Sequence, residues 1–108
     1  MEVWIVDDVP ETRILFEVQL AALEPGQWTI KGFGLAAQAL SALQTNRPTC
    51  VVVDRLLPAE NSDHLVTVFR ERGIPVLVWS GEEKWVLQKR SDFSAWWTRF
   101  RTLVIPMS

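Results

Sequence analysis

The side chains best suited to chemistry in this sequence stand where apolar runs end. Asp7 and Asp8 follow the first such run, Asp54 follows a later β-branched run, and Ser80 follows another. Carboxylates that are crowded together repel one another, and a hard divalent cation with oxygen ligands, such as Mg²⁺, relieves that repulsion. Such a cation also neutralises an incoming phosphoryl group and orients it for attack by a carboxylate. If these runs meet in space, the residues predict a Mg²⁺-assisted site of phosphoryl transfer.

Bringing the runs together requires an alternation of strands and helices. Helical spacing of apolar residues, with Pro-Gly and Gly breaks between segments, predicts the order β-α-β-α-β-α-β-α-β. Such alternation is typical of an α/β fold with a five-stranded parallel sheet and helices on its faces, in which reactive groups lie at the carboxyl ends of strands. The predicted strands are 3–6, 28–33, 50–53, 74–79 and 102–105, and the predicted helices are 10–23, 34–43, one around 65–72 and 82–101.

Bulk composition restricts the function classes. The 108 residues fit one domain, 1–108, and 48% hydrophobic residues can fill a core. The formal net charge of −2 argues against nucleic acid as a partner. With Cys50 as its one cysteine, the chain can form neither an internal disulfide nor a multi-cysteine zinc site, and this is compatible with the cytoplasm. We find no apolar run long enough for a membrane span and no signal-peptide pattern.

A combined pattern of motifs runs through roughly residues 2–81, although each motif alone is common. Its residues are Val6-Asp7-Asp8-Val9-Pro10 with Arg13, the helix Gly34 to Leu43, Pro48, Val51-Val52-Val53-Asp54 leading into Arg55-Leu56-Leu57-Pro58, and Pro75-Val76-Leu77-Val78-Trp79-Ser80-Gly81. In this pattern the chain resembles the receiver (CheY-like) domain of bacterial two-component response regulators. The resemblance implies a doubly wound, flavodoxin-like fold.

The resemblance implies a role for each matching residue. Asp54 corresponds to the phosphoacceptor, and Asp7 and Asp8 to the acidic pair that holds Mg²⁺ together with Asp54. The backbone carbonyl of Leu56 corresponds to a further metal ligand. Ser80 corresponds to the hydroxyl that bonds the phosphoryl group and moves on activation. The implied partners are a histidine kinase or phosphotransfer protein as donor and a downstream protein as target.

Beyond Ser80 the sequence departs from the family pattern. The lysine expected at the end of strand five falls on Ile105, which precedes Pro106, and the aromatic switch position falls on Thr102. The family's fifth helix is missing from the predicted elements. The lysine normally gives a charge-assisted contact to a phosphoryl oxygen. Its absence weakens the phosphorylated state unless Lys84 or another cation substitutes.

Without the fifth helix, one face of the last strands is expected to lie open. Aromatic side chains stand close to basic residues in this region, and an exposed apolar area usually marks an interface. We therefore expect a homodimer or an obligate protein partner. The aromatic residues concerned are Trp85, Trp96, Trp97 and Phe100.

Several functional hypotheses follow from these features. The first is a stand-alone signalling switch whose output is another protein. The second is a pseudo-receiver that keeps its acidic residues but acts as a dimerisation or protein-binding module. A third, hydrolysis through an aspartyl phosphate, is disfavoured because Leu56 stands where such enzymes carry a second acid, so we do not expect an enzyme. The alternative without a functional site is that the three aspartates are only strand-end caps and turn formers.

Overall fold

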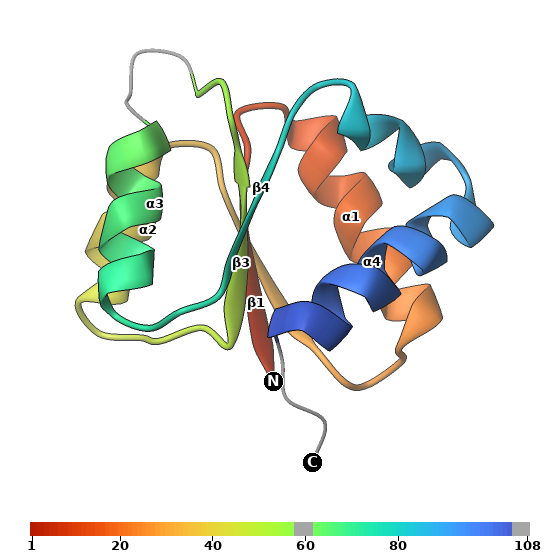
Figure 1. Ribbon diagram of the computed structural model, residues 1–108, viewed down its shortest axis with the longest axis horizontal. Helices are drawn as coiled ribbons and strands as arrows, with labels where there is room; N and C mark the ends of the chain where they lie inside the picture. Colours follow the sequence, from red (N-terminus) through yellow and green to blue (C-terminus); the bar gives the residue numbers. More distant parts are fainter. Residues whose placement is uncertain (58–61, 105–108) are drawn as a thin grey trace.

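The computed structural model describes residues 1–57 and 62–104, which form one sheet flanked by helices (Figure 1). Within these residues, no helix is both long enough and apolar enough to cross a membrane. In chain order the elements are β1 (Glu2–Val6), α1 (Pro10–Leu23), β2 (Thr29–Phe33), α2 (Ala36–Leu43), β3 (Cys50–Asp54), α3 (Ser62–Glu71), β4 (Val76–Trp79), the 3₁₀-helix η1 (Glu83–Gln88) and α4 (Arg90–Val104).

The sheet is parallel, in the order β2-β1-β3-β4. This confirms the predicted α/β class and the positions of the first four strands. The prediction of five strands is wrong for the described residues, in which the sheet has four and β4 forms its edge.

The expected fifth strand, 102–105, is helical through Val104, and Ile105 lies outside the described residues. The helix persists because Phe93, Trp97 and Phe100 follow one another at helical spacing and are all buried. Thr102 continues the helix, and its hydroxyl donates a hydrogen bond to the carbonyl of Thr98 at 2.8 Å. Burial of the aromatic stripe thus outweighs the weak strand preference of the residues after it.

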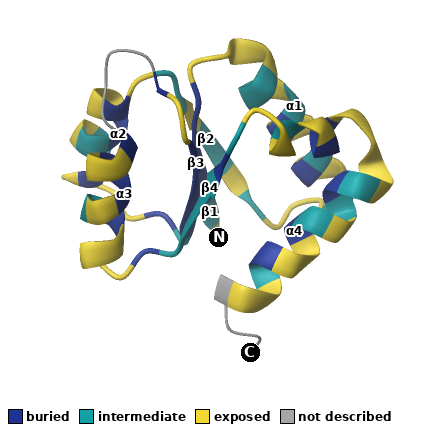
Figure 2. Ribbon diagram, turned by 45° about the horizontal axis from the view of Figure 1, so that its top comes forward, coloured by how far each residue is buried: buried dark blue, intermediate teal, exposed yellow. Residues whose placement is uncertain are grey.

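The two faces of the sheet are covered by different helices (Figure 1). α2 and α3 cover one face, while α1, η1 and α4 cover the other. Alternate residues of β1 and β3 supply the two cores, so both central strands are buried on each side (Figure 2). Trp4 and Val51 point into the α2–α3 core, and Val3 and Val52 into the α1–α4 core.

The expectation that no C-terminal helix covers the face beside the last strands is also wrong, although a groove along the outer edge of β4 stays open. α4 packs beside α1 and covers that face, so Trp97 and Phe100 are buried. The predicted helix over 82–101 is two elements, because Lys89 adopts an extended conformation between η1 and α4. This break lets η1 pack against α1 before α4 turns back along the same face of the sheet (Figure 1).

Cys50 lies at the start of β3 and has no exposed surface, so we expect its thiol to be unreactive in the folded protein. Burial is the largest influence on its thiol and raises its pKa from 9.0 to about 12. We expect a thiol reagent at mildly alkaline pH to label Cys50 only after denaturant is added. Because the unfolded thiol loses its proton first, Cys50 lowers folding stability as the pH rises between 9.0 and about 12. Rapid labelling of the native protein would contradict this placement.

Candidate functional site

The three predicted acidic residues meet at the carboxyl edge of the sheet. Carboxylate oxygens of Asp7, Asp8 and Asp54 all lie within 4.8 Å of one another. Val6 pairs with Val53 in the parallel register, so the residues that follow β1 and end β3 emerge side by side. Asp7 and Asp54 are buried, whereas Asp8 is exposed. The convergence expected from the sequence is therefore present, and an all-oxygen cluster of this size fits a hard divalent cation.

Asp7 is held by the beginning of α1. Its Oδ1 accepts a hydrogen bond from the backbone N–H of Val9 at 2.9 Å, and its own N–H donates to the carbonyl of Phe33 at 2.9 Å. Arg13, one turn into α1, donates to the Asp7 carbonyl. The side chain of Arg13 reaches this carbonyl across Gly32, where an added Cβ would come within 3.0 Å of the Arg13 Cδ. These contacts leave Oδ2 of Asp7 facing the cluster.

Asp54 is oriented by the loop that follows it. Its Oδ1 accepts a hydrogen bond from the N–H of Leu56 at 3.1 Å, and the hydroxyl of Ser62 donates to the Arg55 carbonyl at 2.7 Å. Leu56 itself has an exposed side chain, and the role of its carbonyl as a metal ligand stays a prediction. The second oxygen of Asp54, Oδ2, faces the other carboxylates and the side chain of Lys84.

Lys84 supplies the positive charge of the site. Its Nζ lies 2.7 Å from Oδ2 of Asp7 and 3.1 Å from Oδ2 of Asp54. The side chain of Lys84 is only 18% exposed, so solvent screens these ion pairs less than it screens surface pairs. Sequence reasoning raised Lys84 as a possible substitute cation, but no spacing rule could place it, because it extends from η1 after the edge strand β4.

The protonation of Lys84 reflects two opposing effects. Burial lowers the pKa of its ammonium group, but hydrogen bonds and charges from Asp7 and Asp54 outweigh burial, and the net pKa is raised above 10.5. Lys84 is therefore charged at neutral pH. Its ion pairs contribute stability that is fully present below pH 10.5 and is lost as the pH rises through the raised pKa.

Ser80 follows β4 next to Trp79, which pairs with Asp54 in the register. Its hydroxyl and its N–H both contact Oε1 of Glu83 at 3.3 Å. Ser80 is thus at the predicted strand end, but its hydroxyl is bonded to Glu83 in the first turn of η1. This contact ties the loop after β4 to η1, which carries Lys84.

The indole ring of Trp79 lies against the side chain of Lys84. Nζ of Lys84 lies 5.9 Å from the centroid of the Trp79 ring, within the range of a cation–π interaction. Trp79 in turn stacks on Trp96 of α4, with ring centroids 5.3 Å apart. The sequence analysis did not identify this stack, which connects the acidic cluster to α4.

Comparison with known proteins by sequence gives no match. No protein-family model matches this chain. No curated protein matches it either.

Solved structures do match, over nearly the whole chain. The bacteriophytochrome response regulator AtBRR superposes with a TM-score of 0.74 at 16% identity, covering 99% of this chain and 94% of that one. A response regulator receiver protein from Pseudoalteromonas atlantica gives 0.64 at 13% identity, with 93% and 96% covered. The receiver domain of the Francisella response regulator 1452 gives 0.62 at 16% identity, with 92% and 94% covered. The chain therefore has the fold of response-regulator receiver domains.

Proposed function

We propose that this chain is a receiver module of a phosphorelay, which accepts a phosphoryl group on Asp54 and signals through contacts with other proteins. One observation carries the proposal. Three carboxylates and the ammonium group of Lys84 meet at the carboxyl edge of a sheet with the receiver fold. This function requires a histidine kinase or a phosphotransfer protein as the phosphoryl donor. We therefore propose that the transfer takes place in the cytoplasm.

Asp54 is the nucleophile in this proposal. Its Oδ1 accepts a hydrogen bond from the N–H of Leu56 inside the loop, whereas Oδ2 faces the cluster, so Oδ2 attacks phosphorus once Lys84 has turned from it to a phosphoryl oxygen. A bond forms between Oδ2 and phosphorus, and the bond from phosphorus to the donor group breaks, with its electron pair leaving on the donor. Burial of Asp54 limits access of water to the resulting acyl phosphate.

Lys84 and Ser80 act on the transferred group. The ammonium of Lys84 already touches Oδ2 of Asp54, so it is placed to donate to a phosphoryl oxygen there. In this role Lys84 replaces the lysine that the sequence pattern lacks at Ile105. Ser80 donates to the phosphoryl group only after its hydroxyl leaves Glu83, and this exchange alters the start of η1.

Asp7, Asp8 and Asp54 are the residues that would hold Mg²⁺, with the Leu56 carbonyl as a further ligand. Their oxygen-only donor set suits this ion. Bound there, Mg²⁺ supplies neutralisation of the phosphoryl charge. Because Lys84 contacts two of the three carboxylates, the ion and the ammonium group compete for the same oxygens.

Acetyl phosphate with Mg²⁺ tests the proposal directly. Intact mass is expected to show one added phosphoryl group on the wild-type chain and none on Asp54→Asn. Asp63→Asn, in the first turn of α3, is the matched control and should be labelled like the wild type. If the wild type stays unlabelled while a known receiver is labelled, phosphoryl transfer is rejected. The pseudo-receiver then takes its place, since Lys84 compensates the acidic pocket without any modification.

A further inference from the structure

The outer edge of β4 carries unpaired backbone groups. On its inner side, Pro75 accepts from the N–H of Val51 at 3.0 Å, and Trp79 accepts from the N–H of Arg55 at 2.9 Å. Backbone groups of successive strand residues point to opposite sides, so those of Val76 and Val78 point away from β3. Within residues 1–57 and 62–104 these groups have no hydrogen-bond partner.

This edge also lacks the features that natural proteins use to protect a sheet edge. β4 reads Val-Leu-Val-Trp, with no charge, proline or glycine. Natural edge strands are usually blunted by lysine, proline or a bulge, because an open apolar edge pairs with another strand. β4 is therefore suited to pairing rather than to remaining in water.

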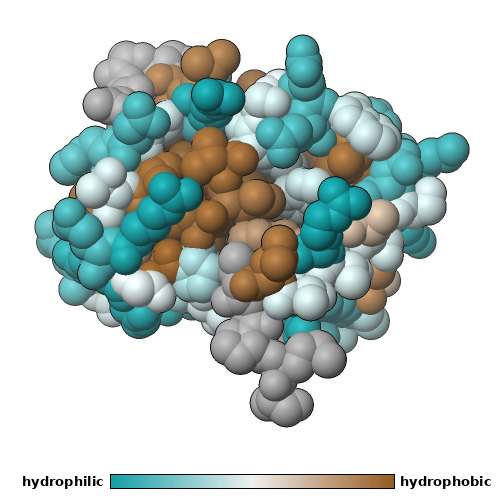
Figure 3. Space-filling model, viewed as in Figure 1, coloured by the Kyte–Doolittle hydropathy of each residue, from teal (hydrophilic) through white to brown (hydrophobic). Residues whose placement is uncertain are grey.

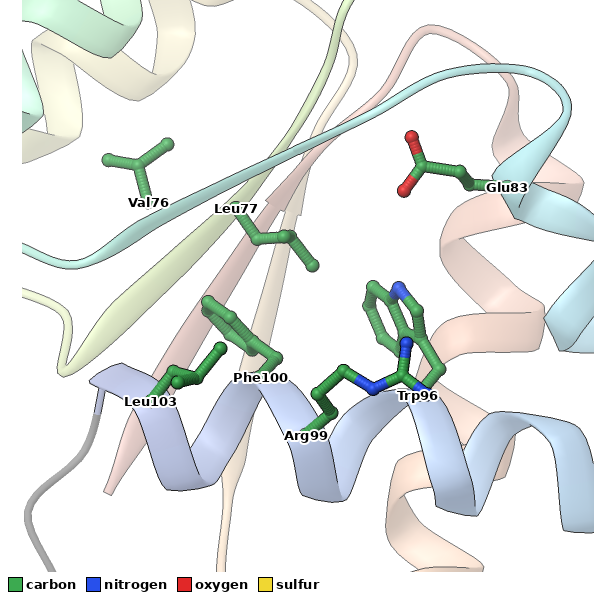
Figure 4. Close-up of a pocket in the computed structure, with 7 residues that line it drawn as sticks. All are labelled: Val76, Leu77, Glu83, Trp96, Arg99, Phe100 and Leu103. Carbon is green, nitrogen blue, oxygen red and sulfur yellow. The ribbon is translucent and has the colours of Figure 1, made fainter.

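An apolar groove of about 260 Å³ runs beside the edge, between β4 and α4. Leu77 and Phe100 extend into it from the two sides, with Trp96 at one end (Figure 4). At the other end, Leu103 is 79% exposed. Figure 3 shows apolar side chains gathered along β4 and over the adjoining part of α4. An exposed apolar strip beside open backbone groups is typical of an interface.

We propose that a second copy of this chain pairs with this edge, β4 against β4, about a twofold axis that passes near Leu77. Twofold symmetry makes the two strands antiparallel. Val76 of each copy then lies opposite Val78 of the other, and each such pair exchanges two N–H···O=C bonds. The outward groups of one edge thus satisfy those of the other, and the joined sheet has eight strands, as follows from four in each copy.

The surroundings of the edge also suit a second copy. A twofold axis normal to the sheet keeps both α4 helices on the same side of the joined sheet. The two grooves then face each other across the boundary between the β4 strands, and each Leu103 becomes buried. The groove is bordered by one acidic and one basic side chain, Glu83 and Arg99. Charges of both signs avoid the repulsion that a single-sign surface would meet in its own copy.

Sedimentation equilibrium of the wild type and two edge variants tests this interface. Val78→Pro removes an outward N–H, and proline is tolerated at such edge positions. Leu103→Glu places a charge in the groove at an exposed site that the fold does not need. Each is expected to weaken dimerisation about tenfold or more, by analogy with the loss of central interface contacts. Ile14→Glu, on α1 and 60% exposed, is the matched control and should dimerise like the wild type.

A disulfide tests the register. Leu77 lies opposite its own copy, so Leu77→Cys is expected to form a covalent dimer on mild oxidation, whereas Ile14→Cys is not. The buried Cys50 is common to both variants. A wild type that is monomeric at high concentration overturns the interface. So does a dimer that neither edge variant weakens, or a heterologous partner found on an otherwise monomeric chain.

Pairing at this edge is independent of phosphoryl transfer. The dimer is measured without phosphate donor or Mg²⁺, and labelling of Asp54 is measured by mass. Failure of the dimerisation experiment therefore leaves the proposed phosphoryl transfer untouched, and failure of the labelling experiment leaves the proposed dimer untouched.

Discussion

Replacing Lys84 by methionine is expected to destabilise the protein and to strengthen its binding of Mg²⁺. The variant keeps the length of the apolar part of the side chain but removes the ammonium group, which leaves Asp7, Asp8 and Asp54 without a compensating cation. Removing one partner of a buried ion pair costs about 3–5 kcal/mol, and partial exposure of Lys84 reduces this to about 2–3 kcal/mol. The free energy of unfolding in urea, measured with divalent ions chelated, is the quantity to compare.

Mg²⁺ should then reverse much of this loss. Without the competing ammonium group, we expect the ion to bind Lys84→Met about tenfold or more tightly than the wild type. Its stabilising effect grows accordingly, since a ligand of the native state raises the free energy of unfolding. Trp79, whose ring lies beneath Lys84, provides a fluorescence signal for the titration.

Lys89→Met is the matched control for Lys84→Met. Lys89 is exposed between η1 and α4, and its side chain belongs to no ion pair within the described residues. It should leave stability and Mg²⁺ affinity unchanged. Equal affinities in the wild type and Lys84→Met would show that Lys84 does not share the oxygens that bind the ion.

Truncating Trp97 to alanine is expected to cost about 3–5 kcal/mol of folding free energy. Trp97 is fully buried on α4 and packs against Phe16, with ring centroids 5.9 Å apart. Its indole N–H donates a hydrogen bond to Oε1 of Glu24 at 3.3 Å, so truncation also removes this hydrogen bond from the Glu24 carboxylate. Thermal and urea unfolding measure the loss, which is a large part of the total stability of a small domain.

Trp85→Ala provides the contrast. Trp85 lies on η1 and is 59% exposed, so the same truncation should change stability by about 0.5 kcal/mol or less. If Trp97→Ala lowered the folding stability as little as Trp85→Ala, α4 would not cover the face of the sheet on which α1 packs. The sheet would then need a different covering element.

The sequence alone was sufficient to predict the acidic cluster. Each aspartate follows a short apolar run, and the carboxyl ends of neighbouring parallel strands meet at one edge of a sheet. Local patterns define the strand positions well, and the convergence of Asp7, Asp8 and Asp54 required in addition only that β1 and β3 be neighbours. The central strands β1 and β3 were predictable for the same reason, since residues buried on both faces form continuous apolar runs.

Only the tertiary structure decided the C-terminal third. Residues 102–104 have no strong local preference, and the helix extends through them because Phe93, Trp97 and Phe100 bury a shared stripe against α1 and the sheet. The position of Lys84 depends on the packing of η1 against α1 and α4. This packing brings a side chain from a separate segment to Asp7 and Asp54, and no local spacing encodes it. The open edge of β4 has the same origin, because an edge exists only once the order of the strands is known.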